Sequence, residues 1–306
     1  MNDPVTEEIQ FDSSGTRCAG VHVRGEGEAF TAPDGRRPCV VIGHGACGTV
    51  DSGLLRFAEG FARAGLDALA FDYRHFGNSD GRPRQMLSPR RQVADYLAAV
   101  RYARGLPGVD PDRIVLWGLS ISGGHVIRAA AEDGRVAAVI SQVPALNGVR
   151  SAIHALPEGS PGDTLRLFAS ALRDRVGSFL GRPPVMAPLI AGRGEPSVLT
   201  SESGLAEMEK LAGPTWRNEV TARFALSALA LQHGRSAPKL PCPVLVQVAL
   251  DDEFLPAGPM YTAAASAPHG GEVRTYPMTH VGMFFDPTFD SVLHDQVDFL
   301  ARHLSA

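Results

Sequence analysis

The residues best suited to chemistry are Gly118-Leu119-Ser120-Ile121-Ser122, which directly follow the apolar run at 113–117. Their spacing matches the nucleophile elbow G-x-S-x-G, with Ser122 in place of the last glycine. A serine on this tight turn between a buried strand and a helix presents its hydroxyl to a reacting carbon. Ser120 is therefore the predicted nucleophile, and Ser122, in the first helical turn, is the better candidate for a structural helix cap.

A serine hydroxyl needs a base to take its proton and an acid to orient that base. The acid is expected in the loop after the apolar strand pattern at 244–248, where Asp251, Asp252 and Glu253 follow one another. The length of the turn and the closing Pro256 favour Asp252. Asp251 is the alternative, interpreted as a solvated turn residue, and Glu253 is expected at the surface.

The base is expected after the last predicted strand, where His280 is the only histidine of its loop. This gives the chain order Ser120, Asp252, His280. His44 is interpreted as a brace of its Gly-His-Gly turn, and His125 as a packed residue of the helix after Ser120. The other histidines are assigned to loops, the last helix or the surface: His22, His75, His154, His233, His269, His294 and His303.

Acyl chemistry on a serine also needs amide donors for the developing oxyanion. One donor is expected to be the N–H of Ile121, at the positive end of the helix that follows Ser120. The other is expected from the glycine-rich loop 44–48, with Ala46 N–H as the predicted donor. Cys47 lies in the same loop and is expected to line the site.

The elements that must position these residues follow from hydrophobic patterning. Short apolar runs predict buried strands, and helical spacing between them predicts parallel β-α-β units and a doubly wound α/β sheet. A strand-turn-strand unit is expected before them, near 11–24. The expected buried strands are 39–42, 66–71, 114–117, 136–143, 244–248 and 272–276, and the expected helices between them are 54–64, 89–104, 121–132, 257–267 and 289–304.

The alternation stops between 144 and 241, where we expect no buried strand. Helical patterns at 165–180, 205–211 and 218–233 alternate with Pro/Gly-rich joints. Because this stretch is too long for a plain loop, we interpret it as a helical cap over the carboxyl edge of the sheet. The predicted organisation is a core of 1–143 and 242–306, interrupted by the cap 144–241.

The composition is that of an ordinary globular protein: 306 residues, 44% hydrophobic, 20% charged and a net charge of −4. No basic block points to nucleic acid, and no apolar run is long enough to span a bilayer. The polar, acidic first residues do not resemble a signal peptide, so we expect a cytoplasmic protein. Its four cysteines are scattered, and free thiols are expected. The sequence contains no metal-ligand cluster and no dinucleotide fingerprint, so no cofactor is expected.

Together these motifs resemble the α/β-hydrolase superfamily over nearly the full length of the chain. The resemblance is greatest to a bacterial branch of serine hydrolases related to dienelactone-hydrolase and prolyl-peptidase-like (S15/S33-like) proteins. It is carried by the elbow 118–125, the loop 71–81, the stretch 107–114 and the tail 295–300. It implies an eight-stranded, mostly parallel sheet with a helical cap. The chain departs from the branch at three positions. Gly282 stands where the branch often has an acidic residue, and Ala249 stands where it often has Gly or Cys. Cys47 is an unusual residue for the 44–48 loop.

The expected function is hydrolysis of an ester, thioester or lactone of a small-molecule acyl substrate through an acyl-enzyme on Ser120. A biosynthetic enzyme that uses the same residues for acyl transfer or elimination is the alternative, because this fold carries many activities. A non-catalytic binding protein is disfavoured, since all three triad positions are filled. A peptidase is also disfavoured, because Glu202, Glu207 and Glu209 form no clear amine-binding pair. A homodimer is left open.

Overall fold

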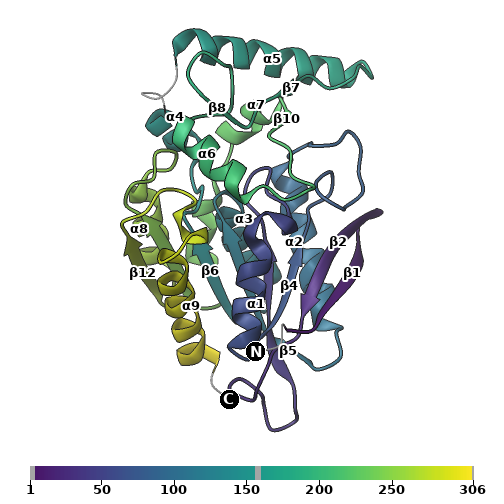
Figure 1. Ribbon diagram of the computed structural model, residues 1–306, viewed down its shortest axis with the longest axis vertical. Helices are drawn as coiled ribbons and strands as arrows, with labels where there is room; N and C mark the ends of the chain where they lie inside the picture. The colour runs from purple at the N-terminus through teal and green to yellow at the C-terminus, as the bar shows by residue number, and fades with distance from the viewer. Residues whose placement is uncertain (1–3, 156–159, 305–306) are drawn as a thin grey trace.

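The core of the molecule is an eight-stranded sheet, seen in a computed structural model that describes residues 4–155 and 160–304 (Figure 1). The strand order is β1-β2-β4-β3-β5-β6-β11-β12. β2 is antiparallel to both neighbours, and the other neighbouring pairs are parallel. The predicted mostly parallel α/β sheet is confirmed. Its strands are β1 (Thr6–Ser13), β2 (Thr16–Val23), β3 (Arg37–Gly43), β4 (Asp67–Phe71), β5 (Val109–Leu119), β6 (Ala138–Gln142), β11 (Val244–Ala249) and β12 (Gly271–Tyr276).

The central strands β3, β4, β6 and β11 are buried along nearly their whole length because helices cover both faces of the sheet. Side chains alternate between two buried clusters, with Val41 and Leu69 in one and Val40 and Ala68 in the other. Helices α1 (Leu55–Arg63) and α9 (Thr288–Leu304) cover the face toward the viewer in Figure 1. Helices α2 (Pro89–Arg104), α3 (Ile121–Asp133) and α8 (Ala257–Ser266) cover the other face. The helix predicted at 89–104 has the bounds of α2.

The stretch between β6 and β11 lies above the carboxyl edge of the sheet in Figure 1, and we refer to residues 143–243 as the insertion. Its long helix α5 runs across the top of the view, away from the sheet. The elements of the insertion are α4 (Gly148–Ala155), α5 (Pro161–Phe179), β7 (Met186–Ala187), β8 (Ile190–Ala191), β9 (Leu199–Thr200), α6 (Glu202–Leu211), β10 (Val220–Thr221), α7 (Phe224–Leu229) and the 3-10 helix η2 (His233–Lys239).

Two expectations for this stretch are wrong. Short strands do occur in it: β10 pairs with β7, and β8 pairs with β9. The sequence does not predict them, because strands of two residues are too short to produce a periodic pattern. The single helix expected at 218–233 is β10 followed by α7 and the start of η2. Its first residues pair across the insertion instead, with Ala222 N–H donating to the carbonyl of Val185. Tertiary pairing here overrides local helical spacing.

The loops that matter for chemistry leave the carboxyl ends of β3, β5, β11 and β12, which face the insertion. In parallel sheets these ends meet at one edge, where ligands usually bind. Within the described ranges we find no helix with the length and apolarity needed to cross a bilayer. The cytoplasmic location stays a prediction.

Candidate active site

Ser120 occupies a strained turn between β5 and α3. Its φ of 58° and ψ of −120° lie where L-residues are rare. Ser120 N–H donates to the carbonyl of Gln142 (2.9 Å), and its own carbonyl accepts from Ala145 N–H (2.9 Å). A Cβ at Gly118 would lie 2.2 Å from the carbonyl oxygen of Ser122, so only glycine fits there. The glycine and the two backbone bonds therefore hold the turn that presents Ser120.

The structure brings Ser120, His280 and Asp252 into one hydrogen-bonded line. His280 Nε2 lies 3.0 Å from Ser120 Oγ, and His280 Nδ1 lies 2.8 Å from Asp252 Oδ2. The other carboxylate oxygen of Asp252 accepts from the N–H groups of Phe254 (2.9 Å) and Leu255 (3.0 Å). Because an ionised carboxylate only accepts, Nδ1 carries the imidazole proton and Nε2 is free to receive one. This is the geometry that a serine nucleophile needs.

The two neighbouring acids have other environments. Asp251 is exposed, as expected for a turn residue. Glu253 was expected at the surface, but it is half-buried and lines a cavity beside Ser120. Its Oε1 accepts a hydrogen bond from Ser201 Oγ of the insertion (2.6 Å). The contact with the insertion is what buries Glu253, and no feature of the local sequence signals it.

The two predicted amide donors border the same space. Ala46 lines the cavities on both sides of Ser120, and its N–H donates no hydrogen bond to another described residue. Ile121 is the first residue of α3, where backbone N–H groups lack an intrahelical acceptor. Both N–H groups are therefore available to an oxyanion formed at Ser120.

A buried polar network fixes the loop that carries Ala46. His44 Nδ1 donates to the carbonyl of Gly45 (2.7 Å), and Tyr73 N–H approaches His44 Nε2 at 3.4 Å. That carbonyl shares its peptide plane with the N–H of Ala46, so His44 orients the predicted donor. Burial lowers the pKa of His44 to about 4, so its imidazole is neutral at pH 7. The geometry therefore supports the predicted role of His44 as a brace of its turn.

Ser122 does not act as a helix cap, because its hydroxyl is used elsewhere. Ser122 Oγ donates to the carbonyl of His44 and lies 2.5 Å from Tyr73 Oη. The serine that replaces the elbow glycine therefore ties α3 to the 44–48 loop. The sequence analysis does not identify Tyr73 as part of the site. Its position could have indicated this role, because Tyr73 lies two residues after β4, in the 71–81 loop that resembles the hydrolase branch.

Three further expectations need correction. Cys47 is fully buried, but its Sγ lies against the carbonyl of Glu219 at 3.2 Å, and Cys47 lines neither of the two cavities beside Ser120. His22 is buried against Asp67, with Nε2 and Oδ2 2.8 Å apart. His233 is also buried, 3.0 Å from His125. Each of the three side chains is buried against a residue that is distant in the sequence. The composition of the surrounding segment therefore could not predict its burial.

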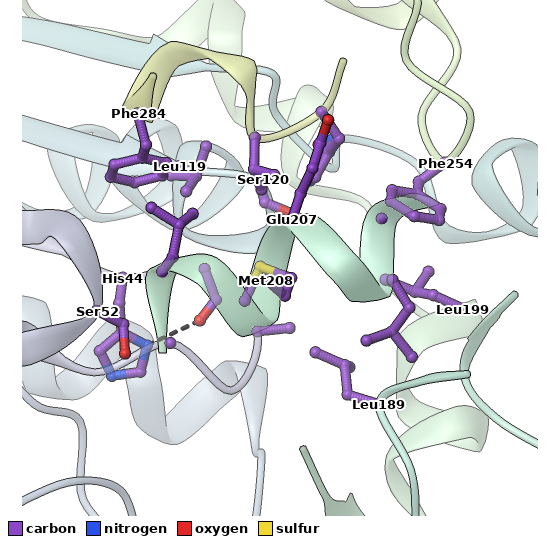
Figure 2. Close-up of a pocket in the computed structure, with 18 of the residues that line it drawn as sticks. His44, Ser52, Leu119, Ser120, Leu189, Leu199, Glu207, Met208, Phe254 and Phe284 are labelled. Atoms are coloured by element: carbon purple, nitrogen blue, oxygen red, sulfur yellow. Dashed lines mark hydrogen bonds between the residues drawn. The ribbon is translucent and has the colours of Figure 1, made fainter. Parts of the chain in front are cut away.

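Two cavities meet at Ser120. The small cavity, about 60 Å³, runs between the 44–48 loop, the His280 loop and α6 of the insertion (Figure 2). The large cavity, about 220 Å³, runs under α4, α5 and α7. The small cavity is lined by Ser52, Leu54, Leu119, Leu189, Glu207, Met208, Leu211, Glu253, His280 and Phe284, among others. The large cavity is lined by Ile121, Ala145, Ala152, Leu167, Phe168, Phe224, Ala225, Ala228 and Leu231, among others.

The insertion is tied to the loops that carry the candidate residues. Glu207 Oε2 accepts from Thr279 Oγ1 (2.8 Å), directly before His280 in the chain. His154 Nε2 lies 3.1 Å from the carbonyl of Asp252. Together with the bond between Ser201 and Glu253, these contacts connect the insertion to both the acid and the base loop. Within the described ranges, no group of three or more His, Cys, Asp or Glu side chains could hold a metal ion.

Proteins of known sequence are similar to this chain. The chain is 38% identical to the quorum-quenching protein AidA of Acinetobacter baumannii over 297 residues, which cover 96% of this chain and 94% of that protein. It is 42% identical to the thiohydrolase aneE of Aspergillus aculeatus over 107 residues, covering 35% and 34% of the two chains.

A solved structure extends the likeness to the fold. The α/β hydrolase GrgF of Penicillium sp. sh18 superposes with a TM-score of 0.79 at 23% identity, covering 98% of this chain and 99% of that one. At that identity the likeness shows the α/β-hydrolase fold alone. The family model described as serine aminopeptidase, S33, matches residues 34–287, which include the nucleophile elbow and both partner loops. The chain therefore belongs to the serine aminopeptidase S33 family of the α/β-hydrolase superfamily.

Proposed function

We propose that this chain is a serine hydrolase that cleaves an ester, thioester or lactone through an acyl-enzyme on Ser120. One observation carries the proposal: Ser120, His280 and Asp252 form a continuous hydrogen-bonded line that opens onto two apolar cavities. The relatives named quorum-quenching protein and thiohydrolase support a small acyl substrate. Ser120 is the proposed nucleophile, His280 the general base and Asp252 the group that orients it.

The proton and the negative charge each have a defined route. Ser120 Oγ attacks the carbonyl carbon while its proton passes to His280 Nε2. The N–H groups of Ala46 and Ile121 stabilise the resulting oxyanion, an effect worth roughly 3–4 kcal/mol per donor in well-studied hydrolases. When the C–O or C–S bond breaks, His280 returns the proton to the leaving oxygen or sulfur. Water repeats the sequence and releases the acid.

The two cavities suggest which part of the substrate lies where. His280 lines the small cavity, so the leaving group that receives its proton belongs there. Ile121 lines the large apolar cavity, which suits an aliphatic acyl portion. The carboxyl groups of Glu207 and Glu253 border the small cavity and disfavour an anionic leaving group. We propose a medium-length, apolar acyl group joined to a small neutral or cationic leaving group, or a lactone bearing an apolar chain.

Covalent labelling tests the nucleophile. A fluorophosphonate should add one adduct to the intact protein, on the peptide that contains Ser120, and Ser120→Ala should abolish it. Ser151→Ala is the matched control, because Ser151 borders the large cavity without a base beside it, and it should label normally. Failure of the wild type to label, or equal labelling of Ser120→Ala, would rule the proposal out.

Product analysis tests the reaction type. With p-nitrophenyl esters of two to ten carbons and a matching thioester, we expect kcat/KM to peak at intermediate chain length. In ¹⁸O-labelled water the released acid should carry one labelled oxygen from deacylation. An acyl group transferred to an added alcohol without label would indicate acyl transfer, and an alkene product would indicate elimination.

A further inference from the structure

The exposed apolar side chains of this protein are concentrated on one part of the insertion. Seven of the ten large apolar side chains that are exposed in the described ranges belong to α4, α5 and the residue after α5. Five lie on or directly after α5, and they are 50–75% exposed: Leu165, Leu172, Val176, Phe179 and Leu180. Scattered single apolar residues are normal on a surface, but a concentration of this kind marks an interaction site.

The exposed apolar residues of α5 follow the spacing of a helix–helix seam. Leu165, Ala169, Leu172, Val176 and Phe179 are exposed and succeed one another at intervals of 4, 3, 4 and 3. This is the heptad spacing of residues that pack into a facing helix. We call these five residues the α5 seam.

The opposite side of α5 already has its partner. Leu167 and Ala171 pack against Ala187, Ala222 and Ala225 of the insertion. Asp174 is buried and bonded to the guanidinium of Arg223 (2.6 and 2.8 Å). A helix that is apolar on two opposite sides belongs in an interior, and only one of the two sides of α5 is covered.

We infer that a second copy of this chain covers the α5 seam, with the two α5 helices antiparallel about a two-fold axis at Leu172. In that register Leu165 faces Phe179 of the second copy, and Leu172 faces Leu172 at the axis. A two-fold interface uses the same surface on both copies, and the near-symmetric spacing of the seam about Leu172 meets that requirement.

The charges along α5 select this orientation. Arg166, Arg173 and Arg175 are exposed along the helix, whereas its acids, Asp163 and Asp174, are buried. A parallel pairing would place each arginine opposite its own copy. Antiparallel pairing about Leu172 places Arg166 opposite Ser178 and Arg175 opposite Ala169, so the like charges are offset. Offset charges of one sign are tolerated, whereas facing charges destabilise a helix pair.

The exposed apolar area of α5 is smaller than that of a standard interface, so we expect a dimer of modest affinity. A 19-residue helix is about 28 Å long. Given the exposures above, the large apolar side chains of α5 present on the order of 500 Å² per copy, if each has about 150–250 Å² when fully exposed. A standard interface buries about 800 Å² per partner. The aliphatic stems of the flanking arginines supply further apolar area.

Solution mass and one charge substitution test the interface. We expect sedimentation equilibrium to give twice the 32.5 kDa of one chain. Leu172→Glu places two carboxylates face to face and should weaken the dimer by at least about a hundredfold, as for a central interface residue. Leu250→Glu, at an equally exposed leucine outside the insertion, should leave the mass unchanged. A wild type that is monomeric at every concentration, or a Leu172→Glu dimer, overturns the inference.

Cysteine crosslinking tests the orientation. All four native thiols are buried, so the background is low. Leu172→Cys should form a disulfide-linked dimer on mild oxidation, and Leu250→Cys should not. A mixture of Leu165→Cys and Phe179→Cys chains should crosslink, whereas Leu165→Cys alone should not. Crosslinking of Leu165→Cys alone would show a parallel pairing, and a monomer that sediments with anionic phosphatidylglycerol vesicles would show that α5 meets a membrane. Either result contradicts the antiparallel dimer.

Discussion

The loops at the carboxyl edge of the sheet and the insertion above them form opposite walls of one site, but they are built differently. In the loops, the candidate residues are buried and fixed by short polar contacts, as Asp252 is by two N–H groups and His280. The insertion offers mostly apolar side chains and touches the loops through a few hydrogen bonds. The comparison suggests that the loops determine whether the bond breaks and the insertion determines which substrate fits.

The largest expected effect falls on the loop wall. Asp252→Asn should lower kcat by about 10⁴-fold, because an amide donates to Nδ1 and turns the imidazole into the wrong tautomer, an effect of that size in other serine hydrolases. Stopped-flow or steady-state kinetics with a p-nitrophenyl ester measure it. The adjacent Asp251→Asn should change kcat less than twofold. Equal losses at both positions would mean that the acid has been misassigned.

A smaller effect is expected at the brace of the 44–48 loop. Tyr73→Phe removes the hydroxyl that contacts Ser122 Oγ and loosens the loop that carries Ala46. We expect kcat to fall by about tenfold with KM nearly constant, since a looser amide donor stabilises the oxyanion less well. The control is Tyr261→Phe, at an exposed tyrosine of α8. A rise in KM without a change in kcat would place Tyr73 in substrate binding instead.

The contact between the end of the insertion and helix α3 should make the stability of the protein depend on pH. His233, in η2 at the end of the insertion, contacts His125 of α3, and burial lowers the pKa of His233 to about 4. Its ordinary pKa is about 6.5, so the unfolded chain binds more protons below that pH, and stability is lost as pH falls from 6.5 toward 4. His233→Gln should reduce the loss of unfolding free energy between pH 7 and 5 by about 1–2 kcal/mol. Denaturant unfolding at both pH values measures this, and an equal loss in the variant would contradict it.

The smallest effect is expected on the insertion itself. Glu207→Gln weakens the bond to Thr279 and removes a negative charge from the small cavity. We expect kcat on a neutral ester to change less than threefold, and kcat/KM for an anionic leaving group to rise by about threefold to tenfold through lost repulsion. Glu209→Gln, at an exposed position on the same helix, is the control. Unchanged discrimination between the two substrates would show that Glu207 does not face the leaving group.

The same contrast describes what the sequence could predict. Strands buried on both faces leave continuous apolar runs, so 39–42 and 244–248 were placed within a few residues of β3 and β11. The proposed triad followed because an elbow, an acid and a histidine must each come after a strand end. The sequence also predicts an interruption of the core at 144–241, but it does not predict the parts of that stretch. The two-residue strands, the contact of Glu207 with Thr279 and the burial of His233 arise from partners far apart in the chain.

The position of the insertion within the sheet also has a consequence for how the protein is made. β11 pairs with β6, but residues 143–243 separate them, and closing so long a loop costs conformational entropy before the pairing is gained. During synthesis, the residues of β3 to β6 and the elbow with Ser120 emerge before those of the insertion, whereas Asp252 and His280 follow the last two strands, β11 and β12. The nucleophile and its two proposed partners are therefore brought together only when β11 and β12 join the sheet.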